Sequence, residues 1–400
     1  MRTFYPPAFY LVLLSVLSLL NSCGSARQMI TVRNPLAIDR SAETVGIAPG
    51  DLKVLRGGFD PEKVLLEEVA TGQPVLRQWL DYDLDGQPDE LIFQVDIKAD
   101  AQKTFALVRD KNGAGRQPQS ERTTFSRFVP ERIDDYAWEN DRVAFRTYGP
   151  EAQRLVEAKQ PGGTLSSGID LWLKRVSYPV IHHWYTRNTE TAGYYHIDHG
   201  EGYDPYHVGT SRGTGGAGVW GNDTLLAGKN FIHYRTLATG PIRTVFELDY
   251  APWSPYGIAE TKRISLDLGS NFSCFEVRLN AAQAPPNYTL GITLHDGKGE
   301  PALYEKEGWF RHWEPMDDSF VGEGIVLDPA RVSRAFVHRS PRPDQSQLLI
   351  STSPRDGSLT YYAGFAWLKS GQVGSVADWD AMLRHKAQCI AHPLEVHIGR

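Results

Sequence analysis

The chain has little cysteine, little methionine and no strong excess of either charge. It contains 3 cysteines and 4 methionines in 400 residues, and its formal net charge is -6. Three cysteines are too few for a disulfide framework, and we expect Cys274 and Cys389, far apart in sequence, to be buried thiols. No basic cluster of the kind that binds phosphates is present, so we expect no nucleic-acid partner.

The chain also lacks a fixed-period repeat, a low-complexity tract and an apolar run long enough to span a membrane. A spanning helix needs about 20 apolar residues, whereas the run from Phe9 to Leu20 has about a dozen. Arg2 precedes this run, and Cys23 follows three residues after Leu20, which is typical of a bacterial lipoprotein signal. We predict a signal peptide over 1–22, lipidation of Cys23, and an exported, lipid-anchored protein that faces the periplasm. The alternative is a plain secretory signal with an incidental Cys23.

Aromatic residues with a polar edge are abundant. The chain has 10 tryptophans and 18 tyrosines, residues on which sugar rings stack, although large β-proteins also use them in their cores. This composition is consistent with a carbohydrate ligand without establishing one.

Short alternating or β-branched runs recur along the chain, and long helical periods are rare. Clear examples lie at 92–97, 243–248, 262–268 and 275–279. The pattern predicts a mainly β fold.

A polar segment with glycines at 109–124 separates two regions of this pattern. We predict a small N-terminal β-sandwich over 23–108. We expect 125–400 to form a large antiparallel β-sandwich domain of supersandwich type, carrying the catalytic site.

An acidic loop lies before the strand at 92–97. Its carboxylates alternate, and a glycine stands at the sixth position, as in loops that wrap oxygen ligands around calcium. The twelfth position, however, is Ile92 instead of an acid. The loop is therefore either a structural calcium site or an acidic hairpin turn. The ligands in the first case are Asp81, Asp83, Asp85 and Asp89.

Two arginines occupy a predicted strand over 141–148. Side chains alternate along a strand, so Arg142 and Arg146 share a face, and burying both requires anions. Either nearby carboxylates pair with them, or they form a fork that grips a sugar carboxylate or sulfate.

The densest group of ionisable and aromatic residues lies between Asp170 and Trp220, where DLWLKRVSYPVIHHWY precedes YHIDHGEGYDPYHVGTSRGTGGAGVW. Glycines interrupt the second segment and predict a loop that presents His196, His199, Glu201 or Asp204 to a pocket as acid or base. His196 and His199 are also candidate metal ligands, but neither cysteine nor an H-E-x-x-H pattern supports zinc.

The same stretch has aromatic and glycine-rich parts. We place Trp184, Tyr185 and Trp220 on a ligand cleft, with core packing as the alternative. The run over 209–218 lacks the phosphate-loop pattern, so its glycines indicate a close approach of backbones around the cleft.

Several blocks together resemble a bacterial family classed only as a domain of unknown function. They are WENDRVAFRTYGP, SGIDLWLKRVSYPVIHHWY, YHIDHGEGYDPYHVGTSRGTGGAGVW, GPIRTVFELDY, ISLDLGSNF, YYAGFAWLKS and the upstream DLDGQPDELIFQ. The resemblance covers essentially the whole mature chain. The family includes dehydratases that act on oligosaccharides of ulvan, a sulfated uronic-acid polysaccharide. The resemblance implies action on a uronic acid at a non-reducing end and leaves individual catalytic residues open.

Dehydration of such a uronate removes the C5 proton and expels the C4 hydroxyl, leaving a 4,5-unsaturated sugar. The reaction needs a carboxylate grip, a base and an acid, and it requires no cofactor. Our hypothesis assigns the grip to Arg142, Arg146 or Lys174 and the base to His196. The remaining candidates are Tyr206 or Tyr185 for the acid, and Asp170, Asp198 or Asp204 to orient the histidine.

Three other functions stay open. A polysaccharide lyase uses the same elimination but expels a sugar, and a glycoside hydrolase needs two carboxylates, such as Glu201 and Asp204. The third is a non-catalytic lipoprotein that binds carbohydrate. In each case the partner is an acidic oligosaccharide, and the membrane is contacted only through the lipid anchor. The sugar, its sulfation and the oligomeric state do not follow from the sequence.

Overall fold

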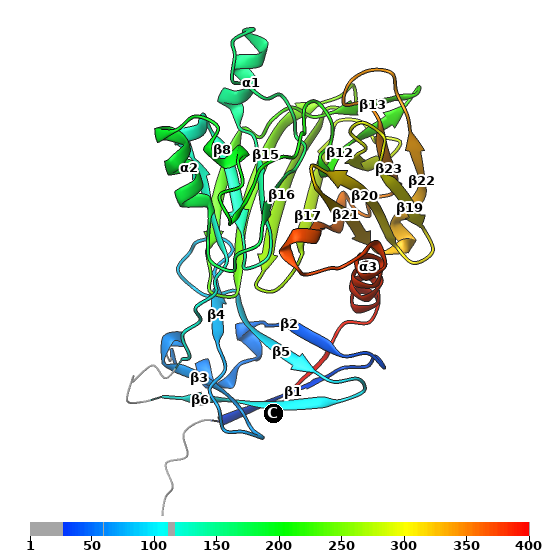
Figure 1. Cartoon of the computed structure of the whole chain (residues 1–400). Helices are drawn as coiled ribbons and strands as arrows, with labels where there is room; N and C mark the ends of the chain where they lie inside the picture. Colours follow the sequence, from blue (N-terminus) through cyan, green and yellow to red (C-terminus); the bar gives the residue numbers. More distant parts are fainter. Residues whose placement is uncertain (1–26, 59, 111–116, 400) are drawn as a thin grey trace, which may run out of the picture.

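The computed structural model describes residues 27–58, 60–110 and 117–399, and antiparallel β-sheets dominate it (Figure 1). The prediction of a mainly β fold is therefore confirmed. The expected signal segment with Cys23 lies outside the described residues, as does 111–116 of the expected linker. Among the residues described, no helix has both the length and the apolar character needed to cross a membrane.

The small N-terminal unit consists of two sheets that pack around apolar side chains such as Ile30, Val32, Phe93 and Phe105. One sheet has the order β25-β1-β6-β3 and the other β2-β5-β4. Their strands are β1 (Arg27–Arg33), β2 (Arg40–Ile47), β3 (Val64–Glu68), β4 (Arg77–Leu80), β5 (Glu90–Ile97), β6 (Gln102–Arg109) and β25 (Glu395–Ile398).

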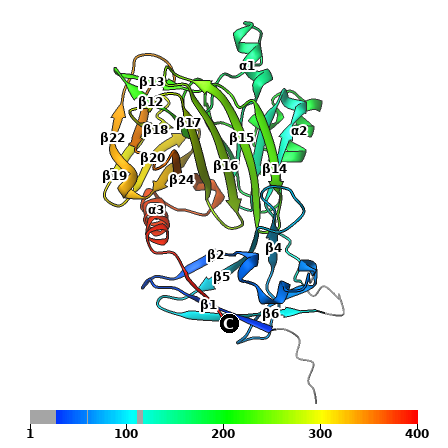
Figure 2. The same cartoon turned by 180° about the vertical axis from the view of Figure 1, so that it is seen from behind.

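The last strand of the chain belongs to this small unit. β25 pairs antiparallel with β1, with Val32 opposite Val396, although the sequence pattern places 395–398 in the large domain. Without β25, strand β1 would be an edge strand with unpaired backbone N–H and C=O groups, so pairing with β25 is favoured. Figures 1 and 2 show the chain running from α3 (Val376–Ala391), beside the large domain, down to the small unit.

The large domain contains two sheets that face each other across one apolar core. The first has the order β14-β15-β16-β17-β24-β21-β20-β19, and the second β13-β12-β18-β23-β22. The first comprises β14 (His233–Ala238), β15 (Arg243–Trp253), β16 (Ile258–Asp267), β17 (Phe272–Ala281), β19 (Glu300–Tyr304), β20 (Trp309–Met316), β21 (Ser319–Leu327) and β24 (Ser358–Trp367). The second comprises β12 (Thr214–Gly221), β13 (Thr224–Ala227), β18 (Tyr288–Thr293), β22 (Val332–His338) and β23 (Gln347–Thr352).

A fifth sheet, β11-β10-β9-β8-β7, lies beside this sandwich and carries parts of three of the sequence blocks singled out above, those at 138–150, 167–185 and 195–220. Its strands are β7 (Phe125–Val129), β8 (Asp135–Glu139), β9 (Ala144–Thr147), β10 (Asp170–Lys174) and β11 (Gly202–Tyr203). The other α-helices are α1 (Pro150–Glu157) and α2 (Ile181–Glu190). Single 3-10 turns occur at Pro49–Asp51, Lys53–Leu55, Pro61–Lys63, Pro130–Arg132, Tyr194–His196, Pro329–Arg331 and Leu368–Ser370.

The helix α2 begins at a buried carboxylate. Glu139 accepts hydrogen bonds from the backbone N–H groups of Val180 and Ile181, which are unpaired at a helix start. The ammonium of Lys174 lies 2.7 Å from the same carboxylate and also donates to the carbonyls of Asn140 and Tyr178. This single carboxylate therefore holds β8, β10 and α2 together.

We expect Glu139→Gln to lower the free energy of unfolding by about 3 kcal/mol, because it leaves the Lys174 ammonium buried without its counter-charge. Urea unfolding followed by fluorescence measures this loss. Glu190→Gln is the matched control: its carboxylate pairs with Arg187 at the surface, and the expected cost is below about 0.5 kcal/mol. Equal losses in the two variants would contradict this account of α2.

Candidate active site

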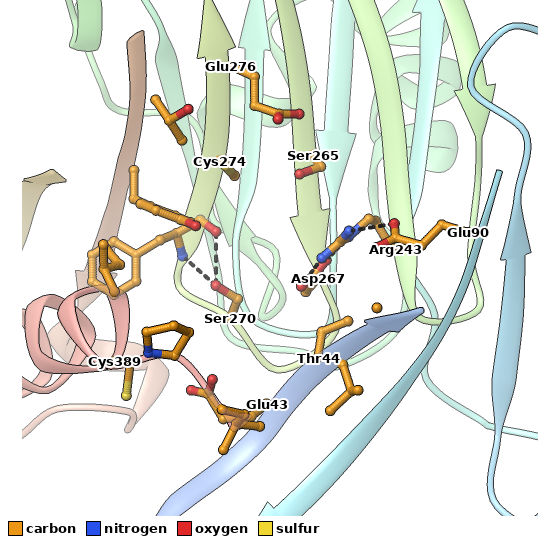
Figure 3. A pocket seen from close by; sticks show the side chains of 18 of the residues that line it. Glu43, Thr44, Glu90, Arg243, Ser265, Asp267, Ser270, Cys274, Glu276 and Cys389 are labelled. Carbon is orange, nitrogen blue, oxygen red and sulfur yellow. Dashed lines mark hydrogen bonds and ion pairs between the residues drawn. The ribbon is translucent and has the colours of Figure 1, made fainter. Parts of the chain in front are cut away.

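A cavity of about 740 Å³ lies between the small unit and the large domain (Figure 3). Its lining includes the ion pair Arg243–Asp267 and the two cysteines Cys274 and Cys389, which are both free thiols. The lining residues come from β2, β5 and β25 of the small unit, from β15, β16, β17, β24 and α3, and from adjoining loops. The cavity is therefore separate from the histidine-rich stretch.

Arg142 and Arg146 do not share a site. Strand β9 begins at Ala144, so Arg142 precedes it and is outside the alternation that predicted a common face. Its guanidinium donates to Asn271 Oδ1 at 3.2 Å and lines a second interdomain cavity of about 290 Å³. The predicted two-arginine fork is therefore not formed.

Arg146 lies in a buried ionic cluster. Its Nε is 2.5 Å from Asp170 Oδ2, its Nη2 is 2.7 Å from Asp204 Oδ2, and its Nη1 is 3.6 Å from Asp135 Oδ2. Tyr148 also donates to Asp170 Oδ2. We call Arg146, Asp135, Asp170 and Asp204 the aspartate–arginine cluster. Because its guanidinium is buried and committed to these carboxylates, Arg146 has no free donor face for a substrate, and the gripping role predicted for it has to be reassigned.

The cluster holds more carboxylates than cations. Arg132 Nη1 lies 3.2 Å from Asp135 Oδ1, so two guanidinium groups face three carboxylates. Burial raises the pKa of Asp204 well above its usual range, although Arg146 opposes the shift. Burial likewise raises the pKa of Asp135. The excess carboxylate is therefore best accommodated as a protonated acid, with Asp204 favoured to carry the proton.

His196 lies at the surface end of this cluster. Its Nδ1 is 2.7 Å from the carbonyl oxygen of Asp204 and 3.6 Å from Asp204 Oδ2, and 53% of its side chain is exposed. A carbonyl only accepts, so Nδ1–H donates and the exposed Nε2 keeps its lone pair. The ring of Tyr195 meets it edge-on. His196 is thus an oriented, solvent-facing imidazole above a buried ionic cluster.

Three other histidines of the stretch have partners outside the aspartate–arginine cluster. His183 Nε2 is 2.7 Å from Glu201 Oε2, His199 stacks on Tyr194, and His207 lies 3.2 Å from Asp344. Among the residues described, no group of potential metal ligands includes His196 or His199.

Four further predicted residues are buried. Lys174 is enclosed by Glu139 and two carbonyls, so it cannot reach a substrate carboxylate. Tyr185 donates to Asp135, and the hydroxyl of Tyr206 lies against Thr214. Trp184 donates its indole N–H to Glu201.

Trp220 lies away from this group, on β12, where it packs against Phe336 and His338. The glycine-rich run leading into β12 does bring backbones together. A Cβ on Gly213 would come within 1.9 Å of the carbonyl oxygen of Ile169, the residue just before β10. Glycine is needed here because the two backbone segments lie so close together, and no ligand is required to explain it.

The structure brings together three of the four acidic-loop residues, Asp81, Asp83 and Asp89. Backbone N–H groups of the loop donate to Asp81, as in an acidic turn. Asp85 is outside the group and accepts from Gln87. Structural calcium therefore stays a prediction here.

Sequence reasoning missed two features. Arg132, from the turn before β8, joins the aspartate–arginine cluster while 20% of its side chain stays exposed. His295, Glu314 and Glu323 form a second group, with His312 3.4 Å from Glu323, and the ring of Tyr206 lies edge-on to His295. The H-W-E triplet at 312–314, with its alternating polar residues, was the available signal for the second.

We expect Asp170→Asn to lower the free energy of unfolding by about 3 kcal/mol, because an amide cannot replace a charged carboxylate. Asp204→Asn should lower it by only about 1 kcal/mol, because an amide is a good substitute for a neutral, protonated acid. Urea unfolding of the two variants measures both losses.

Folded Asp204 binds its proton more tightly than unfolded Asp204, so this contribution to stability is present at low pH and lost as pH rises through the raised pKa. Asp204→Asn should flatten that decline, and an unchanged slope would contradict the assignment.

The chain resembles known proteins along almost its whole length, across both the small unit and the large domain. A protein of Formosa agariphila named "Uncharacterized protein P7" is 42% identical over 394 residues, covering 97% of this chain and 98% of its own. A protein in the glycosyl hydrolase family 38 from Enterococcus faecalis shares the fold with a TM-score of 0.50 at 10% identity. That match covers 94% of this chain and 47% of the other, so the chain spans about half the length of the solved structure. The family model described as a domain of unknown function, DUF4861, matches residues 32–396, and the chain belongs to this family.

Proposed function

We propose that the protein is a carbon–oxygen lyase that removes water from a non-reducing-end uronic acid of ulvan-type oligosaccharides. The observation that carries the proposal is His196, whose Nδ1 is fixed on the Asp204 carbonyl while 53% of its side chain is exposed. A base for C5 needs this arrangement, because the attacking nitrogen must be free and the ring must be held in one orientation. The fold is shared with a carbohydrate enzyme, which is compatible with the proposal.

In this proposal the aspartate–arginine cluster positions the base. Nδ1–H of His196 points at the backbone of Asp204, and Arg146 holds the Asp204 side chain. After proton transfer the imidazolium still donates its Nδ1–H to the Asp204 carbonyl oxygen, 2.7 Å away, so the ring keeps its orientation. Asp204, Arg146 and Asp170 are thus positioning residues, and they do not touch the sugar.

Arg132 takes the gripping role that the sequence assigned to Arg142, Arg146 or Lys174. Its guanidinium lies 3.2 Å from Asp135 of the aspartate–arginine cluster, and 20% of its side chain is exposed. As the C5 proton leaves, negative charge spreads onto the sugar carboxylate, and a nearby cation lowers the barrier.

The proton donor for the C4 hydroxyl must also be reachable. Tyr185 and Tyr206 are buried, so neither can approach a sugar in this conformation. His183 is half-exposed on α2, which packs against the turn that carries His196, and Glu201 orients it. We therefore assign the acid role to His183.

The geometry favours elimination over the alternatives. A glycoside hydrolase needs two carboxylates that face one sugar, but Asp204 is buried against Arg146 while Glu201 is bound by His183, Trp184 and Tyr178. The two tryptophans that the sequence placed on a ligand cleft, Trp184 and Trp220, are buried, so neither offers a stacking platform to a passive binding protein. The proposal keeps the expected export and lipid anchor at Cys23.

The test is mass spectrometry of saturated, uronate-ended ulvan oligosaccharides incubated with the full chain. We expect the loss of one water and new absorbance from the unsaturated uronate, whereas a polysaccharide lyase would give two fragments. His196→Gln should lower kcat by roughly 100-fold or more with an unchanged unfolding midpoint.

His199→Ala is the matched control, because His199 lies in the same loop and stacks only on Tyr194. It should keep near-normal turnover. If His196→Gln also keeps it, the loop is structural and His196 is not the base.

A further inference from the structure

A second polar cluster lies inside the large domain, and both of its sheets contribute to it. His312 and Glu314 alternate along β20 and therefore share a face. Glu323 of β21 lies directly opposite His312 in the register of the two strands. His295 follows β18 of the facing sheet. We call these four residues the His–Glu cluster.

Two members of the cluster, His312 and Glu323, are buried and lie 3.4 Å apart without a well-formed hydrogen bond. Both ring nitrogens of His312 and both carboxylate oxygens of Glu323 lack a hydrogen bond within the part of the chain that the structure describes. Both side chains are fully buried. Leaving such groups unpaired is costly, and a bound cation would satisfy the carboxylate and one nitrogen together.

His295 has the hydrogen-bond pattern of a metal ligand. Its Nε2 lies 2.8 Å from the carbonyl oxygen of His207 and must donate, because a carbonyl only accepts. Its Nδ1 pairs with Glu314 Oε1 at 2.7 Å, and a metal bound between these two atoms would replace that hydrogen bond. Metal-bound histidines commonly donate their second N–H to a carbonyl in this way, which fixes the tautomer.

The donor atoms have the spacing of a compact metal site. His312 Nδ1 lies 3.4 Å from Glu323 Oε2 and 3.9 Å from Glu314 Oε2. Ligand atoms around tetrahedral zinc are separated by roughly 3.3 Å, so small shifts would bring them into one coordination sphere. A Cβ on Gly299 would come within 2.1 Å of His312 Nε2, so glycine there leaves room for the ring.

The chemistry of the cluster selects the kind of cation. Two imidazoles and two carboxylates suit zinc and similar divalent transition metals better than calcium or magnesium. The competing solution is one proton shared by Glu314 and Glu323, with Glu323 neutral through its raised pKa.

We propose that the His–Glu cluster binds one divalent transition metal of the zinc class. Four protein ligands and deep burial are typical of a closed, structural site, so the metal joins the loop after β18 to β20 and β21. The proposal does not depend on the dehydratase activity, because its readouts are metal content and stability.

The experiment uses the purified full chain. Metal analysis should find about one equivalent of zinc-class metal, and the chelator-treated protein should bind Zn²⁺ in a calorimeter with one site. Zn²⁺ should raise the unfolding temperature of that protein, and Co²⁺ in its place should give tetrahedral absorption bands. Absence of metal in the purified chain, together with no Zn²⁺ binding after chelation, would overturn the proposal in favour of the shared proton.

Glu323→Gln and His295→Gln should each weaken Zn²⁺ binding at least tenfold. Two variants are used so that a folding defect in one leaves the other as a test, and the Zn²⁺ affinity of each is measured only where its own unfolding curve shows it to be folded. Asp81→Asn is the matched control, since it disables the other group of clustered carboxylates. If Asp81→Asn abolishes the bound equivalent while Glu323→Gln keeps it, the metal belongs to the acidic loop and the proposal is wrong.

Discussion

The aspartate–arginine cluster is the interaction on which the rest of the site depends. Arg146 comes from β9, Asp135 from β8 and Asp170 from β10, so three neighbouring strands meet at one guanidinium. Asp204 adds the loop that carries His196. Charges removed from water in this way are tolerated only when they are well paired, so the positions of strands and loop are interdependent.

This dependence explains why the loop is ordered despite its glycines. The backbone N–H of Asp204 donates to the carbonyl of Tyr195, and Arg146 donates to the Asp204 side chain. The turn with His196 is therefore held by both a backbone and a side-chain hydrogen bond. Arg175 and Asp198 pair at the far end of the loop. A histidine at the surface thereby acquires one orientation from groups that are themselves buried.

Tyr206 connects the two polar clusters of the large domain. Its ring meets His295 edge-on, and its pKa is raised by burial together with the nearby carboxylates of Glu323, Glu314 and Asp170. A tyrosine in this position is held as a neutral phenol and contributes packing between the clusters. A metal at the His–Glu cluster would reduce the negative charge on one side of it.

The sequence by itself determined the fold class and the strands, because alternation at 243–248, 262–268 and 275–279 survives in β15, β16 and β17. It also directed attention to His196. Only the tertiary structure decided which charges are buried. Local spacing placed Arg142 and Arg146 together, but their partners, Asn271 for one and Asp170 and Asp204 for the other, are distant in sequence. The His–Glu cluster and the pairing of β25 with β1 likewise depend on contacts between distant segments, which local patterns do not encode.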